Sequence, residues 1–190
     1  MPQQRANLNN ATALLVDSDH FTRGIIAHML RGFGLEAPVL LSAGKEAQEY
    51  LQHAYVDICI VESMLPDMMG TDLVSWIRRR EASQIRYVPI IMMTGYTQFH
   101  LVSEARDAGA SLVVKKPVSA QMLWDRIVWA GRSNRAFIET ADYVGPDRRF
   151  RSAGPPNGKG RRESDRAGSE EGAARPSGQD EEQDRKKAAV

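Results

Sequence analysis

The chain has 190 residues, of which 42% are hydrophobic, and 25 lysines and arginines nearly balance 24 aspartates and glutamates, leaving a formal net charge of +1. This length allows one ordinary domain with a real core and a further segment. A single cysteine, Cys59, excludes an internal disulfide and a cysteine-rich metal site. Neither an apolar secretion signal nor a run of ~18 apolar residues is present, so we expect a cytoplasmic protein without a membrane partner.

Apolar runs alternate with amphipathic stretches through residues 11–133. The apolar runs predict strands over residues 13–16, 38–41, 57–61, 88–93 and 112–114. Helical spacing of apolar residues predicts helices over 20–33, 42–53, 71–82, 98–108 and 120–131. Such alternation is typical of βαβ units, whose crossovers are right-handed. The favoured fold is therefore α/β, a doubly wound five-stranded parallel sheet in flavodoxin-like order.

Two segments flank this domain. Residues 1–10 are expected to form a flexible N-terminus, and residues 134–190 a low-complexity, largely disordered tail, because their apolar residues are too sparse to offset the entropy of ordering. The tail carries a basic block over residues 148–166 and an acidic block over 170–184. Since the two blocks can screen each other, the basic block is a weak signal for nucleic-acid binding.

Polar side chains follow four of the predicted strands. Asp17, Ser18 and Asp19 follow the first, Glu62 the third, Thr94 the fourth and Lys116 the fifth. The carboxyl ends of parallel strands meet at one edge of the sheet, so we expect one pocket. Carboxylates are ligands for Mg²⁺, and an ammonium and a hydroxyl group can hold phosphoryl oxygens. Asp19 is expected to cap the first helix rather than to bind metal.

Four stretches in the same order, over residues 14–19, 57–70, 89–95 and 109–117, resemble the signature of response-regulator receiver domains. The resemblance implies a CheY-like fold and a place in two-component phosphorelay signalling. It assigns the phosphoacceptor position to Glu62, the metal-site acid to Asp17, the switch hydroxyl to Thr94 and the phosphate-binding lysine to Lys116. Similar Gly-Pro-Asp-Arg-Arg segments follow some stand-alone receivers, which makes Arg148 and Arg149 candidate recognition residues, with a solvated linker as the alternative.

Three residues depart from the receiver pattern. Glu62 replaces the phosphoacceptor aspartate, Ser18 replaces the second residue of the acidic pair, and Val113 stands where many receivers carry a switching Tyr or Phe. The extra methylene of Glu62 displaces the nucleophile by more than the ~1 Å that already costs heavily in rate. Loss of a carboxylate at Ser18 weakens Mg²⁺ binding. We therefore expect no required cofactor and only weak Mg²⁺ binding at Asp17.

The favoured reading is a non-enzymatic, stand-alone pseudo-receiver that acts by protein contact through residues 98–132, with homodimer formation left open. Glu62 either holds an activated-like conformation through Lys116 and Thr94 or is the product of drift, and the sequence favours neither. One alternative function is a receiver that is phosphorylated on another carboxylate such as Asp17. Another is a nucleic-acid-binding adaptor that acts through the basic tail, although nucleic acid is not the expected partner.

Overall fold

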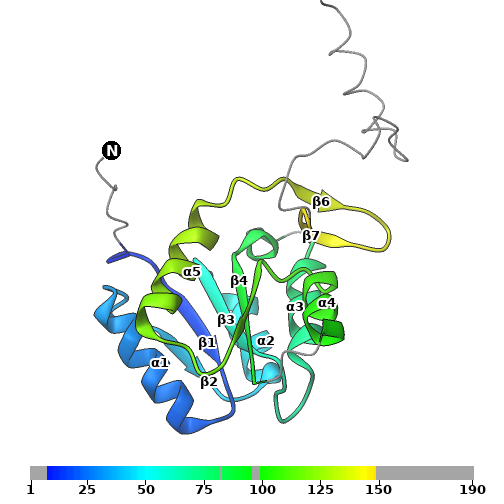
Figure 1. Ribbon diagram of the computed structural model, residues 1–190. Helices are drawn as coiled ribbons and strands as arrows, with labels where there is room; N and C mark the ends of the chain where they lie inside the picture. The colour runs from blue at the N-terminus through cyan, green and yellow to red at the C-terminus, as the bar shows by residue number, and fades with distance from the viewer. Residues whose placement is uncertain (1–7, 82, 96–98, 149–190) are drawn as a thin grey trace, which may run out of the picture. The chain divides into compact units, whose positions relative to one another are not determined.

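The computed structural model describes residues 8–81, 83–95 and 99–148, and these form a five-stranded parallel sheet in the order β2-β1-β3-β4-β5 (Figure 1). The strands are β1 (Ala13–Val16), β2 (Val39–Leu41), β3 (Ile58–Glu62), β4 (Ile90–Thr94) and β5 (Leu112–Lys115). All four neighbouring pairs are parallel. The predicted doubly wound α/β sheet is confirmed.

Five α-helices follow the five strands and cover both faces of the sheet (Figure 1). They are α1 (His20–Gly32), α2 (Gly44–His53), α3 (Gly70–Arg78), α4 (Phe99–Asp107) and α5 (Ala120–Arg132), with a 3-10 helix η1 (Gln84–Tyr87) before β4. Helices α1 and α5 pack on one face, whereas α2, α3 and α4 pack on the other.

The core consists of two apolar clusters because successive strand side chains point to opposite faces of the sheet. Leu15, Ile60 and Met93 belong to the cluster under α1 and α5, while Leu14 and Cys59 belong to the cluster under α2, α3 and α4. Burial raises the pKa of the Cys59 thiol to about 12, so this cysteine is a small core residue, as expected.

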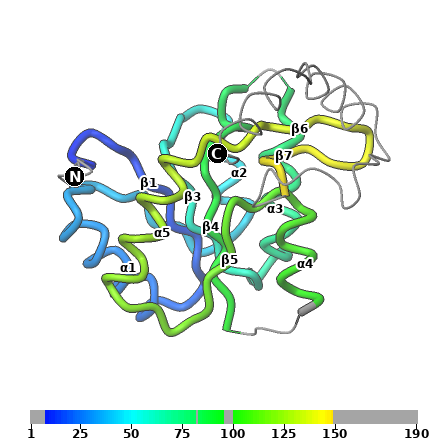
Figure 2. The backbone as a smooth tube through the Cα atoms, turned by 45° about the horizontal axis from the view of Figure 1, so that its top comes forward, coloured from blue at the N-terminus to red at the C-terminus, as the bar shows by residue number. Residues whose placement is uncertain are grey.

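The chain beyond α5 forms a hairpin that the sequence does not predict. Strands β6 (Phe137–Glu139) and β7 (Val144–Pro146) pair antiparallel, and β7 contacts α3. Figure 2 shows the hairpin beside α3. The sequence pattern assigns these residues to the tail, and that boundary at residue 134 is wrong. Each strand has only three residues and contains too little apolar alternation to be recognised, so its stability comes from contacts with the domain.

These contacts join hairpin residues to each other and to residues far away in the sequence. Tyr143 is buried and its hydroxyl donates a hydrogen bond to the carbonyl of Pro146. Glu139 in β6 forms an ion pair with Arg86 of η1, with 2.8 Å between Oε1 and Nη2. Arg148 pairs with Asp107 at the end of α4 over 2.7 Å. The folded part therefore continues to at least residue 148.

The ends of the chain are described only in part. Leu8 packs against the cluster under α1 and α5, and its carbonyl accepts a hydrogen bond from the amide of Ala11. The predicted flexible segment 1–10 is therefore too long at its C-terminal end. Residues 1–7 and 149–190, on which the remaining predictions of flexibility and disorder fall, lie outside the described residues. In the described part, no helix combines the length and the apolar character that a membrane span requires.

Gly109 between α4 and β5 is a sensitive point of the hairpin contact. Its φ is +102°, and a Cβ there would lie 2.7 Å from the Val144 carbonyl oxygen and 2.8 Å from Cγ of Arg78. We expect Gly109→Ala to lower the free energy of unfolding by about 1–3 kcal/mol, measured by urea denaturation. Gly131→Ala in α5 is the control, because nothing lies within 4 Å of its Cβ position. Helical alanine there should add about 0.5–1 kcal/mol. Equal effects of the two substitutions would contradict the close approach of β7.

Candidate functional site

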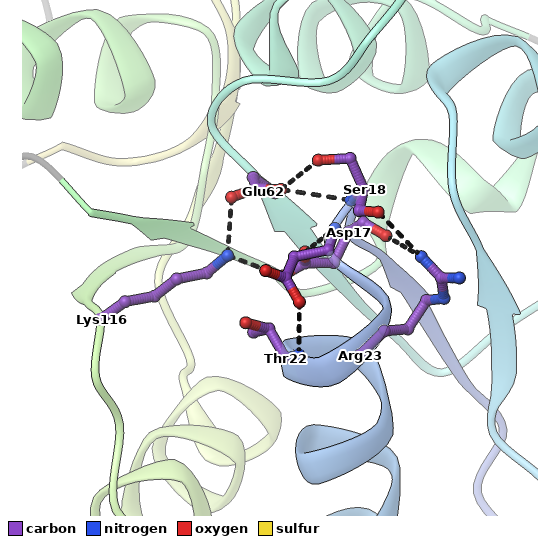
Figure 3. Close-up of polar contacts among 7 residues, drawn as sticks. Asp17, Ser18, Thr22, Arg23, Glu62 and Lys116 are labelled. Atoms are coloured by element: carbon purple, nitrogen blue, oxygen red, sulfur yellow. Dashed lines mark hydrogen bonds and ion pairs between the residues drawn. The ribbon is translucent and has the colours of Figure 1, made fainter.

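Three charged side chains meet at the C-terminal edge of the sheet. Asp17 directly follows β1, Glu62 ends β3, and Lys116 directly follows β5. Lys116 Nζ lies 2.7 Å from Asp17 Oδ2 and 2.6 Å from Glu62 Oε1, so one ammonium bridges two carboxylates (Figure 3). Asp17 is fully buried, and the side chains of Glu62 and Lys116 are each 17% exposed.

Ser18 supplies the second half of the Glu62 environment. Its backbone amide donates to Glu62 Oε2 over 3.2 Å, and its hydroxyl donates to the same oxygen over 3.1 Å (Figure 3). A carboxylate at position 18 would place negative charge against this oxygen instead. The two departures from the receiver pattern, Glu62 and Ser18, are therefore complementary to each other in this pocket.

The first turn of α1 fixes the loop that carries Asp17. The backbone amide of Asp19 donates to Asp17 Oδ1 over 2.9 Å. Asp19 itself caps α1 by accepting a hydrogen bond from the Thr22 amide over 2.8 Å, which confirms its expected role. Arg23 also donates through Nη1 to the backbone carbonyl of Asp17. Both the carboxylate and the backbone carbonyl of Asp17 are therefore fixed by hydrogen bonds.

The pKa values follow from burial and from the single ammonium. Burial raises the pKa of Asp17, and this effect outweighs the opposing hydrogen bond and charge of Lys116. Burial also acts on Glu62, but the hydrogen bond and charge of Lys116 outweigh it and lower the pKa of that carboxyl. Burial opposes ionisation of Lys116, yet its bonds to Asp17 and Glu62 raise its pKa. Glu62 therefore ionises more readily than Asp17, and Lys116 stays protonated.

The four carboxylate oxygens of this pocket are all engaged. Asp17 Oδ1 accepts from an amide and Oδ2 from Lys116, while Glu62 Oε1 accepts from Lys116 and Oε2 from Ser18. A hard cation such as Mg²⁺ requires several oxygen ligands, and here an ammonium occupies the space between the two carboxylates. Within the described residues, no group of three or more His, Cys, Asp or Glu side chains is arranged to hold a metal. Weak binding of Mg²⁺ at Asp17 therefore stays a prediction.

Thr94 and Val113 lie near this pocket but outside the charged cluster. Thr94 ends β4 and is 2% exposed, and its backbone carbonyl accepts a hydrogen bond from the Lys116 amide over 2.8 Å. Among the described residues, Glu62 accepts hydrogen bonds from Lys116 and Ser18. Val113 in β5 is partly buried against the cluster under α2, α3 and α4. The role of Thr94 as a switch hydroxyl stays a prediction.

Of the two arginines predicted for recognition in the tail, only Arg148 is described. It pairs with Asp107 and lies over the ring of Tyr143, with 3.8 Å from its Cζ to the ring centroid. Its guanidinium thus already has partners within the domain. Arg149 lies outside the described residues.

Sequence reasoning missed what Ser18 and Arg23 do. Ser18 stands out in the sequence only as a missing carboxylate, whereas in the structure it is a donor to Glu62. The signal that could have revealed this is the coincidence of the two replacements, because a longer acid and a short hydroxyl can meet across the pocket. Arg23 carries no motif, so its bond to the Asp17 carbonyl depends on the tertiary structure alone.

The lowered pKa of Glu62 leads to an expected pH dependence. Stabilisation by ionised Glu62 is fully present above its ordinary pKa of 4.5 and is lost as the pH falls through the lower folded-state value. The stability difference between the native chain and Glu62→Gln should therefore be constant above about pH 5.5 and shrink below pH 4.5. Chemical denaturation across a pH series measures it. A difference that grows on acidification would contradict the assigned ion pair.

Comparisons with known proteins agree with this fold. The chemotaxis protein CheY of Pseudomonas aeruginosa is 30% identical over 114 residues, which are 60% of this chain and 90% of that protein. A cyclic di-GMP phosphodiesterase of Thermotoga maritima is 32% identical over 126 residues, which are 66% of this chain. The match covers 32% of that phosphodiesterase, so the chain spans about a third of its length.

A solved structure gives the same picture. The chemotaxis response regulator CheY4 of Vibrio cholerae superposes with a TM-score of 0.58 at 28% identity, covering 63% of this chain and 98% of that one. The family model described as the response regulator receiver domain matches residues 13–128, well over half of the chain. The chain therefore belongs to the response-regulator receiver family of two-component signalling.

Proposed function

We propose that this receiver acts through protein contacts without taking a phosphoryl group, with Glu62 holding its pocket in one fixed arrangement. The observation that carries the proposal is the bridging of Glu62 between Lys116 Nζ at 2.6 Å and the amide and hydroxyl of Ser18 at 3.2 Å and 3.1 Å. Lys116 thereby has a permanent anionic partner where the resemblance places phosphoryl oxygens. Drift alone gives no reason for Ser18 and Glu62 to complement each other.

The pocket also disfavours phosphoryl transfer to either carboxylate. A nucleophilic carboxylate needs an oxygen that can approach phosphorus in line, and both oxygens of Glu62 are held by donors. The alternative acceptor Asp17 is fully buried, and both of its oxygens accept hydrogen bonds. The observed contacts therefore favour the contact function over phosphorylation at Asp17.

The proposed partner surface consists of α4, β5 and α5, within residues 98–132. Met122 and Trp129 are large apolar side chains of α5 that remain 42% and 36% exposed. On α4 the exposed residues are polar or charged, namely His100, Glu104, Arg106 and Asp107. This combination of an exposed aromatic and a charged rim is typical of protein interfaces. Gln98 and the side chain of Phe99 lie outside the described residues.

Coupling between the pocket and this surface passes through β5. Lys116 directly follows β5, and its amide is bonded to the last residue of β4 over 2.8 Å. The ion pair between Glu62 and Lys116 therefore constrains the end of β5, the strand that leads into α5. Loss of this ion pair is expected to change the affinity for the partner.

The test begins with capture of the partner on the immobilised full chain, followed by affinity measurements with variants. Glu62→Gln should weaken binding by about fivefold or more, within the range of typical coupling energies. Glu49→Gln is the matched control, since Glu49 is exposed on α2 and is not part of the cluster of Asp17, Glu62 and Lys116. Unchanged affinity in both Glu62→Gln and Lys116→Ala would contradict the proposal and support drift.

A further inference from the structure

A second concave site lies at the end of the sheet where the strands begin, opposite the end that carries Asp17, Glu62 and Lys116. It is a cavity of about 190 Å³, bounded by the segments that precede β4 and β5, by the C-terminal end of α5 and by the β6–β7 hairpin. Its lining combines arginines, hydroxyl groups and aromatic rings, from Arg78, Arg135, Ser111, Ser133, Tyr87 and Phe137. Because Pro89 and Ser111 precede strands whose far ends carry Thr94 and Lys116, this cavity is separated from the first pocket by the length of the sheet.

Arg78 brings a buried positive charge to this cavity. Its residue exposure is 1%, and its guanidinium donates to three backbone carbonyls, those of Gly109 at 2.9 Å, Arg86 at 2.6 Å and Val88 at 2.8 Å. These bonds use Nε and Nη1. No ion pair to Arg78 exists among the described residues. Carbonyl oxygens satisfy its donors but carry no full negative charge, and a buried charge without a counter-ion is costly.

Arg135 brings a second guanidinium to the same cavity from the segment after α5. It donates to the Ser111 carbonyl over 2.8 Å, to Ser133 Oγ over 3.2 Å and to the Asp147 carbonyl over 3.2 Å. Its Cζ lies 4.9 Å from the ring centroid of Trp129. Burial lowers the pKa of Arg135, as it lowers that of Arg78 to about 10. Both groups stay protonated at neutral pH.

The hairpin completes the cavity with an aromatic wall. The rings of Phe137 and Tyr87 meet edge to face with 4.6 Å between centroids, and Cζ of Arg78 lies 5.9 Å from the Phe137 centroid. The nearby pair of Arg86 and Glu139 has its carboxylate side chain 55% exposed. That carboxylate is already paired with Arg86 and faces solvent. The charge of Asp147 acts on Arg135, whereas no ion pair to Arg78 exists among the described residues.

We propose that this cavity binds a small oxyanion, a phosphate or carboxylate group, between the guanidinium groups of Arg78 and Arg135. Planar guanidinium groups match such anions in geometry and charge. The hydroxyls of Ser111 and Ser133, which accept hydrogen bonds from the Ile90 amide and from Arg135 Nε, line the same site. The volume corresponds to roughly six water molecules, which limits the occupant to a small anion or to one anionic group of a larger ligand. The site is independent of Glu62 and Lys116.

The test is a titration of the full-length ¹⁵N-labelled protein with inorganic phosphate, with acetate as the carboxylate arm and chloride at matched ionic strength as the reference. Saturable shifts of the Ser111 and Ser133 amides are expected with phosphate, acetate or both, and not with chloride. Comparison of the phosphate and acetate titrations shows whether the cavity binds phosphate groups, carboxylate groups or both. Residue-resolved shifts also separate this site from Lys116 and from the basic tail.

Arg135→Gln should weaken this binding at least tenfold, while Arg126→Gln, an exposed residue of α5, should leave it unchanged. The amide spectrum of Arg135→Gln reports in the same experiment whether that variant is folded. If it is not, the wild-type titration decides alone. Absence of saturable shifts at Ser111 and Ser133 with both oxyanions, or equal binding by folded Arg135→Gln, would overturn the proposal.

Discussion

The double variant Ser18→Asp/Glu62→Asp is expected to take up a phosphoryl group from a small phosphodonor in the presence of Mg²⁺. The shorter side chain at position 62 withdraws the carboxylate from Lys116 and returns the nucleophile to the position that the family motif specifies. The new carboxylate at position 18 supplies the missing oxygen ligand beside Asp17. Intact mass after incubation with the donor, with and without Mg²⁺, measures the gain.

The single variants separate the two contributions. Ser18→Asp alone replaces the hydroxyl contact of Glu62 Oε2 with a like charge, while the backbone amide contact remains, so it should lose about 1–3 kcal/mol of stability without gaining phosphorylation. Glu62→Asp alone should gain less phosphorylation than the double variant because the metal site still lacks an acid. A folded double variant that stays unmodified would show that more than these two positions blocks the chemistry.

Lys116→Met is expected to lower the free energy of unfolding by about 3–5 kcal/mol at pH 7. Removing the ammonium leaves Asp17, which is fully buried, and Glu62 without their shared cation. Their mutual repulsion and burial then raise both carboxyl pKa values. A raised folded-state pKa contributes stability at low pH that is lost as the pH rises, so the deficit of this variant should shrink on acidification.

Lys115→Met is the matched control, because Lys115 is the neighbouring lysine of β5 and its side chain is exposed. It should change stability by less than about 0.5 kcal/mol. Urea denaturation of both variants at pH 7 and at pH 5 gives the comparison. Similar losses in the two variants, or a Lys116→Met deficit that does not depend on pH, would contradict a central role of Lys116 in the charge cluster.

The sheet, its helices and the position of the charged pocket could be predicted from the sequence because their signals are local and regular. Apolar runs mark β1, β3 and β4, and helical spacing marks α1 and α5. The motif spacings then bring Asp17, Glu62 and Lys116 to the same edge. Their contacts of 2.6 Å and 2.7 Å in the structure agree with that expectation.

The features that were missed depend on contacts between distant residues. Strands β6 and β7 have three residues each, and their position depends on the ion pairs that Glu139 and Arg148 form with Arg86 and Asp107. The cavity beside Arg78 likewise exists only once the hairpin has folded back. The orientation of the second Glu62 oxygen toward Ser18 depends on side-chain geometry that motif spacing does not specify.

The most direct measurement is the intact mass of the native full-length chain after incubation with a small phosphodonor and Mg²⁺. With all four carboxylate oxygens of Asp17 and Glu62 engaged, the expected result is an unmodified mass under conditions in which the Ser18→Asp/Glu62→Asp variant is phosphorylated. A stoichiometric phosphoryl adduct on the native chain, lost on Asp17→Ala or Glu62→Gln substitution, would contradict a receiver that signals without phosphate.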